Sequence, residues 1–145
     1  STCCWRAGAR SSAAVERVSM NGFVMVFLGG GLGAAARHGV NLLSAQVVGS
    51  RFPWGTLAIN VLGSLLIGVL AEWFALRTQL PQPLRLFLIT GVLGGFTTFS
   101  AFSLEVGLLM QRGQMGAAAG YVLASVVAAV AAMFAGMYLV RHVAV

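Results

Sequence analysis

The sequence predicts an all-α membrane protein of four transmembrane helices, the third of which is broken in its middle. Hydrophobic residues make up 59% of the 145 residues, charged residues only 8%, and the mean hydropathy is +0.90. A soluble surface of mixed charges cannot be built from this composition. Four long apolar segments are separated by short polar links, and a run of glycines and hydroxyl residues at 94–100 interrupts the third.

Residues 1–19 precede the apolar sequence and are predicted to be a disordered extension. They mix arginine with small polar residues, lack hydrophobic periodicity and end where Met20 opens the first apolar segment. We therefore assign the transmembrane domain to residues 20–145 and leave the extension out of the fold prediction.

Each of the four spans has its own boundary signals. The first runs from about residue 21 to 43, and the three spans that follow argue against a cleaved signal peptide. Trp54 and Trp73 frame the second span, since 19 positions of helix cover roughly 28 Å of a hydrocarbon layer about 30 Å thick. The third runs from about 84 to 110, and residues 112–114 turn the chain into the fourth, about 115 to 140.

Charge is scarce and one-sided. The nine basic residues are all arginine, and the only acidic residues are three glutamates. We expect these arginines to meet anionic lipid headgroups and not nucleic acid. Outside the extension they divide three against three between the two sides of the membrane, so the positive-inside rule gives no net orientation. Such a chain can insert both ways and pair with its inverted copy as an antiparallel dual-topology homodimer. The two sets are Arg77, Arg85 and Arg141 on one side, and Arg37, Arg51 and Arg112 on the other.

Small residues recur four positions apart in every span, a pattern that lets helix backbones approach closely in lipid. We expect most of the glycines to serve this packing. The pairs are Gly29/Gly33, Ser64/Gly68, Gly91/Gly95, Gly116/Gly120 and Ala132/Gly136.

The interruption of the third span indicates an ion site. Gly94 and Gly95 weaken the helix, and four hydroxyl residues in the next positions compete for its backbone groups. Broken backbone at membrane depth needs protein or a water-filled path to satisfy it. Freed carbonyls suit a hard cation such as Na⁺, whereas free amides at a half-helix N-terminus suit an anion. A simple packing kink is the alternative.

Neutral polar and aromatic residues elsewhere in the spans are further candidates. Asn60 lies six positions inside Trp54, and such a buried amide serves either a helix–helix hydrogen bond or a ligand. Phe99 and Phe102 share a helix face as packing residues, or turn the positive edges of their rings to a small anion. The candidate hydroxyls, which bridge helices or form a ladder of donors, are Ser103, Tyr121 and Ser125.

Two charged residues lie near the spans. Glu105 is an acid inside the third span, and it would be a structural vestibule group, an arginine partner or a proton carrier. Arg37 lies close enough to its helix end to snorkel, or attracts anions to a vestibule.

Four segments together resemble the Fluc (CrcB) family of fluoride channels. They are GGGLGAAAR at 29–37, WGTLAINVLGSLLIG at 54–68, GVLGGFTTFSAFSLE at 91–105, and the helix that carries Tyr121 and Ser125. The resemblance covers the chain from Met20 onward. It implies a multi-pass channel domain in the bacterial inner membrane that exports fluoride passively and relieves its toxicity, working as a dual-topology dimer with two pores.

The resemblance also implies roles for individual residues. Asn60 would donate its amide to fluoride, Phe99 and Phe102 would present ring edges, and Ser103, Tyr121 and Ser125 would extend the polar track. The backbone carbonyls of Gly94 and Thr97 would hold a central Na⁺. Arg37 and Glu105 match charged family positions.

Two other functions remain open from the residues themselves. A small dual-topology, proton-coupled drug or cation exporter would need an essential acid, for which Glu105 is available. A non-transporting membrane subunit would need only the small-residue packing. No nucleophile with its base is recognisable, and we expect no enzyme activity.

Overall fold

The computed structural model describes residues 6–76 and 81–143, with side chains from residue 20 onward. The described chain is helical, and four segments are long and apolar enough to cross a membrane. This confirms the four predicted spans. Their bounds are Met20–Val47, Trp54–Leu76, Gln82–Gln111 and Met115–Val143.

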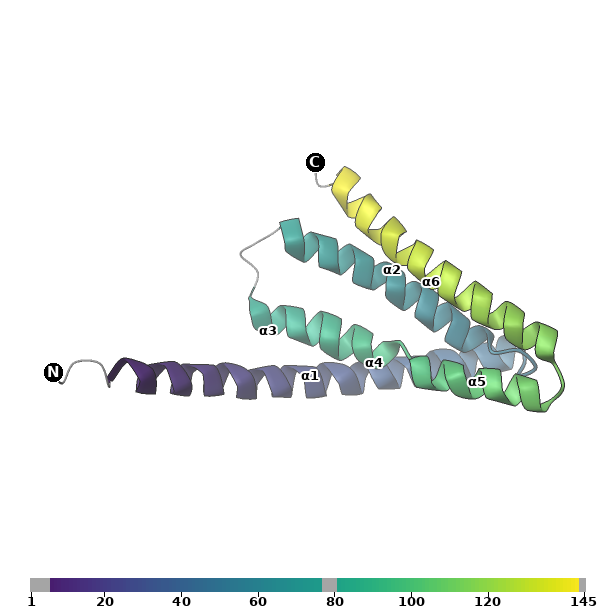
Figure 1. Ribbon diagram of the computed structural model, residues 1–145, viewed down its shortest axis with the longest axis horizontal. Helices are drawn as coiled ribbons and strands as arrows, with labels where there is room; N and C mark the ends of the chain where they lie inside the picture. The colour runs from purple at the N-terminus through teal and green to yellow at the C-terminus, as the bar shows by residue number, and fades with distance from the viewer. Residues whose placement is uncertain (1–5, 77–80, 144–145) are drawn as a thin grey trace.

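The helices form two pairs that meet at one end of the molecule (Figure 1). The first, second and fourth spans are single helices, α1 (Arg6–Val47), α2 (Trp54–Leu76) and α6 (Met115–Val143). The third span is divided into α3 (Gln82–Arg85), the π-helical segment η1 (Leu86–Leu93), α4 (Gly94–Phe96) and α5 (Phe99–Gln111). The most extensive packing joins α2 to α6 and α1 to η1.

Helix α1 begins at Arg6, fourteen positions before Met20. Residues 1–5 of the predicted extension lie outside the described residues, but the backbone of 6–19 is helical where the sequence predicts disorder. Alanine, arginine and glutamate favour helix, and residues 9 to 19 contain neither glycine nor proline. No residue in this stretch therefore interrupts α1. The division at residue 20 stays a prediction.

The third span is broken as predicted, but two residues later than its glycines. Gly94 is still helical, with φ −65° and ψ −36°. The backbone becomes extended at Thr97 (φ −74°, ψ 155°) and Thr98 (φ −153°, ψ 123°). The break thus falls within the predicted segment 94–100, at its two threonines, while the two glycines before them stay helical. Gly95 serves close packing, since a Cβ there would collide with the carbonyl oxygen of Gly30, whereas a Cβ on Gly94 would make only an ordinary contact with the Ile89 carbonyl.

The break redirects the third span from one helix pair to the other. Before it, η1 and α4 pack on α1; after it, α5 packs on α6. Helix α5 and α6 are then joined by the predicted turn at residues 112–114, in which Gly113 has a φ of +72° that favours glycine. The Gly113 amide donates to the Met110 carbonyl at 2.9 Å, and the Gln114 amide to the Leu109 carbonyl at 3.0 Å.

Glycines set the closest helix contacts. A Cβ at Gly33 would meet the Val92 carbonyl, and a Cβ at Gly91 would lie 2.9 Å from the Cα of Gly29. Between α2 and α6, a Cβ at Gly68 would meet the Met133 carbonyl, and one at Gly136 the Leu65 carbonyl. These contacts support the packing role predicted for the small residues. Gly116 and Gly120 differ, because a Cβ there would have no described neighbour within 4 Å.

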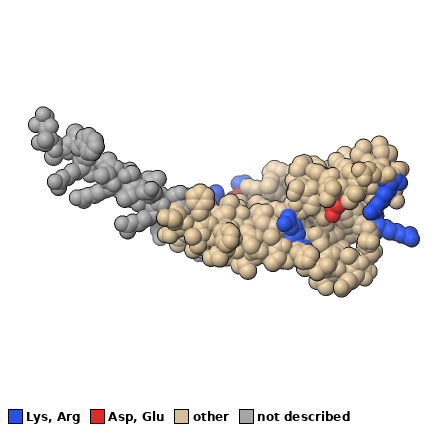
Figure 2. All heavy atoms as spheres, turned by 90° about the horizontal axis from the view of Figure 1, so that it is seen from below, with Lys and Arg blue, Asp and Glu red and all other residues tan. Residues whose placement is uncertain are grey.

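Most charged side chains lie toward the two ends of the bundle, and the surface between them is largely apolar. Few blue or red spheres interrupt the tan surface in Figure 2. At one end, Arg51 and Arg112 lie around the same cavity. At the other, Arg141 Nε donates to Glu72 Oε1 at 2.6 Å and ties α6 to α2. The predicted placement of Arg77 lies outside the described residues.

We predict that Gly33→Ala destabilises the bundle by about 1–3 kcal/mol, because its Cβ would overlap the Val92 carbonyl and lie 2.8 Å from the Phe96 amide nitrogen. The measurement is the free energy of unfolding in mixed micelles. Gly39→Ala on the same helix is the control, since a Cβ there meets nothing within 4 Å. Equal stability of the two variants would contradict the assigned contact.

Candidate functional site

Asn60 on α2 holds the broken backbone of the third span. Its Oδ1 accepts from the Thr98 amide at 2.9 Å, and its Nδ2 donates to the Thr98 carbonyl at 3.0 Å. One side chain thus satisfies both backbone groups of a residue that has left the helical ladder. An unsatisfied buried donor or acceptor costs about 1–3 kcal/mol, so this double contact makes the break tolerable at membrane depth.

The hydroxyls of Thr97 and Thr98 form further hydrogen bonds with backbone groups on either side of the break. Thr97 Oγ1 donates back to the Leu93 carbonyl at 2.9 Å, and Thr98 Oγ1 accepts from the Ala101 amide at 3.2 Å. Thr98 is therefore the N-cap of α5. Helix α2 comes close enough because of Gly63, where a Cβ would collide with the Thr97 methyl group. Gly63 lies one turn beyond Asn60 on the same side of α2.

A cavity of about 500 Å³, here called the mid-span cavity, opens beside the break. Its walls combine neutral polar groups with aromatic and aliphatic side chains. Six residues predicted for the site line it: Asn60, Gly94, Thr97, Phe99, Phe102 and Ser125. The remaining lining residues are Ser64, Ile67, Thr98, Val126, Ala129 and Val130.

The two phenylalanines have unequal surroundings. Their ring centroids are 5.6 Å apart, but Phe102 is 8% exposed whereas Phe99 is 78% exposed. Ser103 is also exposed; its Oγ donates to the Phe99 carbonyl at 2.9 Å, and it does not line the mid-span cavity. Within one chain, Ser103 therefore contacts the backbone of Phe99 but does not join the predicted pore residues that line the mid-span cavity.

Tyr121 and Ser125 are buried one helical turn apart on α6. The Tyr121 hydroxyl donates to Glu105 Oε2 at 2.7 Å, and Thr56 Oγ1 donates to Glu105 Oε1 at the same distance. Two helices thus each supply a hydroxyl to the one carboxyl group of α5. Ser125 Oγ is buried and has no hydrogen-bond partner within the described part of the chain. A buried hydroxyl of this kind is a ready donor for a bound group.

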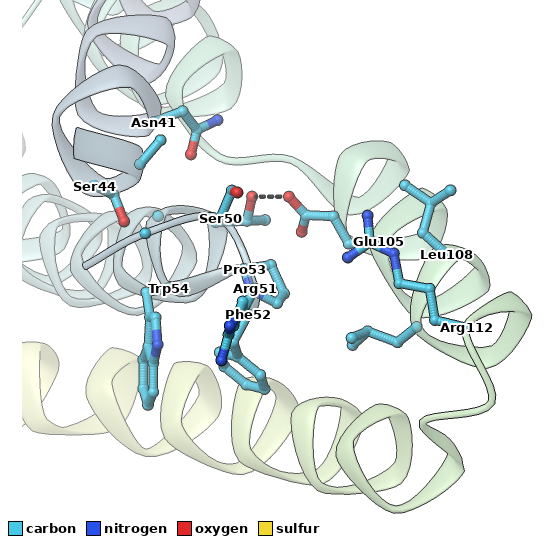
Figure 3. A pocket seen from close by; sticks show the side chains of 15 residues that line it. Asn41, Ser44, Ser50, Arg51, Phe52, Pro53, Trp54, Glu105, Leu108 and Arg112 are labelled. Atoms are coloured by element: carbon cyan, nitrogen blue, oxygen red, sulfur yellow. Dashed lines mark hydrogen bonds between the residues drawn. The ribbon is translucent and has the colours of Figure 1, made fainter. Parts of the chain in front are cut away.

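A second cavity of about 280 Å³, the outer cavity, lies at the end where the helix pairs meet. Figure 3 shows Glu105 facing the side chains of the α1–α2 loop, with the dashed line marking its bond to Thr56. Arg51 and Arg112 give this cavity a positive rim. Arg37 is half-buried on α1 and lines neither cavity, although the sequence proposes it as a vestibule residue.

Aromatic rings connect the two cavities. Phe52, which lines the outer cavity, meets Tyr121 edge-on with centroids 5.4 Å apart. Tyr121 in turn lies 5.1 Å from Phe102, which lines the mid-span cavity. These rings belong to the buried cluster that unites α5 with α6. The carboxyl group of Glu105 accepts a hydrogen bond from the hydroxyl of Tyr121, the middle ring of the three.

Sequence reasoning missed three participants. Thr56 is 1% exposed and anchors Glu105; its position four residues before Asn60 on one helix face was an available signal. Phe52 lies in the loop between α1 and α2 and carries no periodic signal. The backbone of Thr98 could not be identified as the partner of Asn60, because the two residues are 38 positions apart.

Side-chain metal ligands do not gather in the described part of the chain, where no group of three His, Cys, Asp or Glu residues could hold an ion. A cation at this site would depend on backbone and hydroxyl oxygens, which are the ligands that hard cations prefer. The mid-span cavity offers such oxygens at Gly94 and Thr97.

The fold and the two cavities define a multi-pass membrane protein with a site of neutral polar groups at mid-span. The sequence matches the family described as CrcB-like protein, Camphor Resistance (CrcB), over residues 24–137. The chain belongs to this family, and the resemblance inferred from its motifs is confirmed.

Curated relatives support the same assignment. A protein of Nitrobacter hamburgensis named fluoride-specific ion channel FluC 2 is 55% identical over 120 residues, covering 83% of this chain and 97% of the relative. A protein of Methylobacterium nodulans named fluoride-specific ion channel FluC is 58% identical over 119 residues, 82% of this chain and 95% of the relative. A protein of Agrobacterium fabrum with the same name is 50% identical over 123 residues, 85% and 98% respectively. With its four spans, this chain is a multi-pass protein of the bacterial cell membrane.

We predict that Tyr121→Phe lowers the free energy of unfolding by about 1–3 kcal/mol, because Glu105 Oε2 loses the hydroxyl that donates to it. Chemical unfolding in mixed micelles measures the change. Tyr138→Phe serves as the matched control, since Tyr138 is exposed and its ring packs on His142. A Tyr121 variant as stable as this control would refute the importance of the Glu105 contact.

Proposed function

We propose that the chain forms a fluoride-selective channel that lets the ion leave the cell passively and so relieves fluoride toxicity. The observation that carries this proposal is the mid-span cavity, where an amide, a hydroxyl and aromatic edges converge without a fixed cation among the lining residues. Relatives that share half or more of the matched residues are named fluoride-specific ion channels.

The chemistry of the cavity suits a small, strongly hydrated anion. Fluoride crosses only if several donors replace its water, yet a buried fixed cation would hold it too tightly for rapid exit. Asn60 Nδ2 carries two hydrogens, of which one binds the Thr98 carbonyl, so the second can donate to fluoride. Ser125 supplies an unpartnered hydroxyl, and Phe99 and Phe102 supply positive ring edges.

The path continues from this cavity toward the outer cavity along Tyr121. Its hydroxyl would line this track as a neutral polar group; because its one hydrogen is donated to Glu105, the positive edge of its ring is the part that can face fluoride. Arg51 and Arg112 would concentrate anions at the mouth. Arg37 would act in a vestibule only where the assembled protein brings it beside the path.

The complete pore requires a second copy of the chain. Within one chain, Phe99 and Gly94 are exposed at mid-span, and the polar lining of the cavity would face lipid. Lipid offers no hydrogen bonds to these groups, whereas an inverted partner does. An antiparallel homodimer would also bring exposed Ser103 to the path and accounts for the even division of arginines.

The freed backbone of the break would hold Na⁺ at the dimer axis. In a continuous helix the Gly94 carbonyl would accept from the Thr98 amide, and the Thr97 carbonyl from the Ala101 amide. Both amides donate elsewhere, to Asn60 and to Thr98 Oγ1. The carbonyls of Gly94 and Thr97 would thus be ligands for the ion. When bound, Na⁺ would supply a positive charge to which the carbonyls of the broken third spans of both copies are attracted.

Passive efflux from liposomes tests the function. A fluoride electrode should record rapid fluoride release with negligible chloride release. Asn60→Ala should slow release about tenfold or more, because one hydrogen bond to an anion contributes about 1.5–3 kcal/mol. Phe102→Leu should also slow it, whereas Phe134→Leu, a change at a 60% exposed position on α6, should not.

Two results would overturn the channel. If folded wild-type protein releases no fluoride, the proposal of a fluoride channel is wrong. Release that requires an opposing proton gradient would favour the proton-coupled exporter and return Glu105 to the centre of the mechanism.

Dual topology predicts that a residue at one end of the bundle is found on both sides of the membrane. A single cysteine at Gln114, introduced after Cys3 and Cys4 are replaced by serine, should react with a membrane-impermeant maleimide in about half of the molecules in sealed vesicles. Complete labelling, or none before permeabilisation, would contradict the inverted dimer. Labelling after permeabilisation is the control for reactivity.

A further inference from the structure

We propose that Asn60 builds the cation site as well as donating to the anion, because it takes the Thr98 amide away from the Gly94 carbonyl. This inference rests on the proposed function, which includes Na⁺ at the carbonyls of Gly94 and Thr97. It assigns to Asn60 a positioning role, through backbone hydrogen bonding, that is separate from its contact with fluoride.

The helical register identifies which carbonyl Asn60 affects. An amide at position i donates to the carbonyl at i−4, so the Thr98 amide belongs to Gly94 in an uninterrupted helix. Here the Thr98 amide lies 2.9 Å from Asn60 Oδ1. The i−4 register is present immediately before the break, after the π-helical η1, since the Thr97 amide donates to the Leu93 carbonyl at 2.9 Å. The diversion therefore begins at the one amide that Asn60 captures.

The second carbonyl is released by the residue that Asn60 clamps. Thr98 Oγ1 accepts from the Ala101 amide at 3.2 Å, and that amide would otherwise serve Thr97. This N-cap requires the extended backbone of Thr98, which the double contact with Asn60 fixes. Both carbonyls of the cation site thus depend on the Asn60–Thr98 contact, one directly and one through the cap.

The placement of the groups links the two ions. Asn60, Gly94 and Thr97 all line the mid-span cavity, and Gly94 is exposed there. Close approach of α2 at Gly63 keeps Asn60 against the break. Fluoride bound at Asn60 Nδ2 and Na⁺ bound at the Gly94 carbonyl would both depend on the contact between Asn60 and Thr98. Their affinities are then coupled, and each ion should strengthen the binding of the other.

Na⁺-dependent thermal stability tests this role without relying on ion flux. The unfolding midpoint of the purified full chain is measured in detergent, without fluoride, in sodium chloride and in N-methyl-glucamine chloride. Wild-type protein should gain on the order of 5 °C in sodium. Asn60→Ala should lose most of this gain. Ser125→Ala, a change in the same cavity away from the break, should keep it.

A second variant separates the two roles of Asn60. Asn60→Asp retains an oxygen that can accept from the Thr98 amide and so free the Gly94 carbonyl, but it lacks the amide donor, so it should keep more of the sodium gain than Asn60→Ala and lose fluoride release. A folded aspartate variant without the sodium gain would overturn the inference, because it has both the acceptor and added negative charge. An alanine variant with the wild-type gain would overturn it as well.

Failure of the underlying function gives a different pattern. Wild-type protein that releases fluoride but gains no stability from sodium would eliminate the cation site and, with it, this coupling. Wild-type protein that gains stability from sodium but releases no fluoride would reject the channel, while the alanine and aspartate variants would still decide the role of Asn60.

Discussion

The fold depends on one constraint: a helix broken in lipid must find hydrogen bonds for its freed backbone. Asn60 meets that requirement for Thr98 with both ends of its amide, at 2.9 and 3.0 Å. Because the break is stabilised there, η1 and α4 can pack on α1 while α5 crosses to α6. The two helix pairs are joined through this change of direction (Figure 1). The mid-span cavity lies beside it.

Polar groups inside the bundle form a connected set rather than isolated exceptions. Glu105 receives hydroxyls from Thr56 on α2 and Tyr121 on α6, both at 2.7 Å. Tyr121 then contacts Phe52 at the outer cavity and Phe102 at the mid-span cavity. The Glu105 side chain, which is costly to bury, thereby links α5 to both α2 and α6 through hydrogen bonds. The same groups mark the path that we propose for fluoride.

Backbone contact supplies much of the packing because the core is small. The central cluster of buried hydrophobic residues consists of Phe102, Leu109, Ala118 and Tyr121. Elsewhere glycine lets helices approach, as at Gly33 against Val92 and Gly68 against Met133. Lipid provides no hydrophobic drive between helices, so such close van der Waals contact takes its place. The exposed Phe99 and the open mid-span cavity lie on the surface that the proposed second copy would cover.

The sequence by itself determined the four spans, the break and the neutral character of the site. Composition and length fix the spans because an apolar helix must cross the hydrocarbon layer, and the cluster at 94–100 weakens only one of them. The tertiary structure decided how the break is held. Gly94 and Gly95 stay helical, the chain opens at Thr97 and Thr98, and Asn60 closes on it from 38 positions away. It also joined Thr56 to Glu105 and left Ser103 outside the cavity. Local propensity cannot specify these outcomes, because each depends on which side chain another helix brings to a freed backbone group or a buried charge.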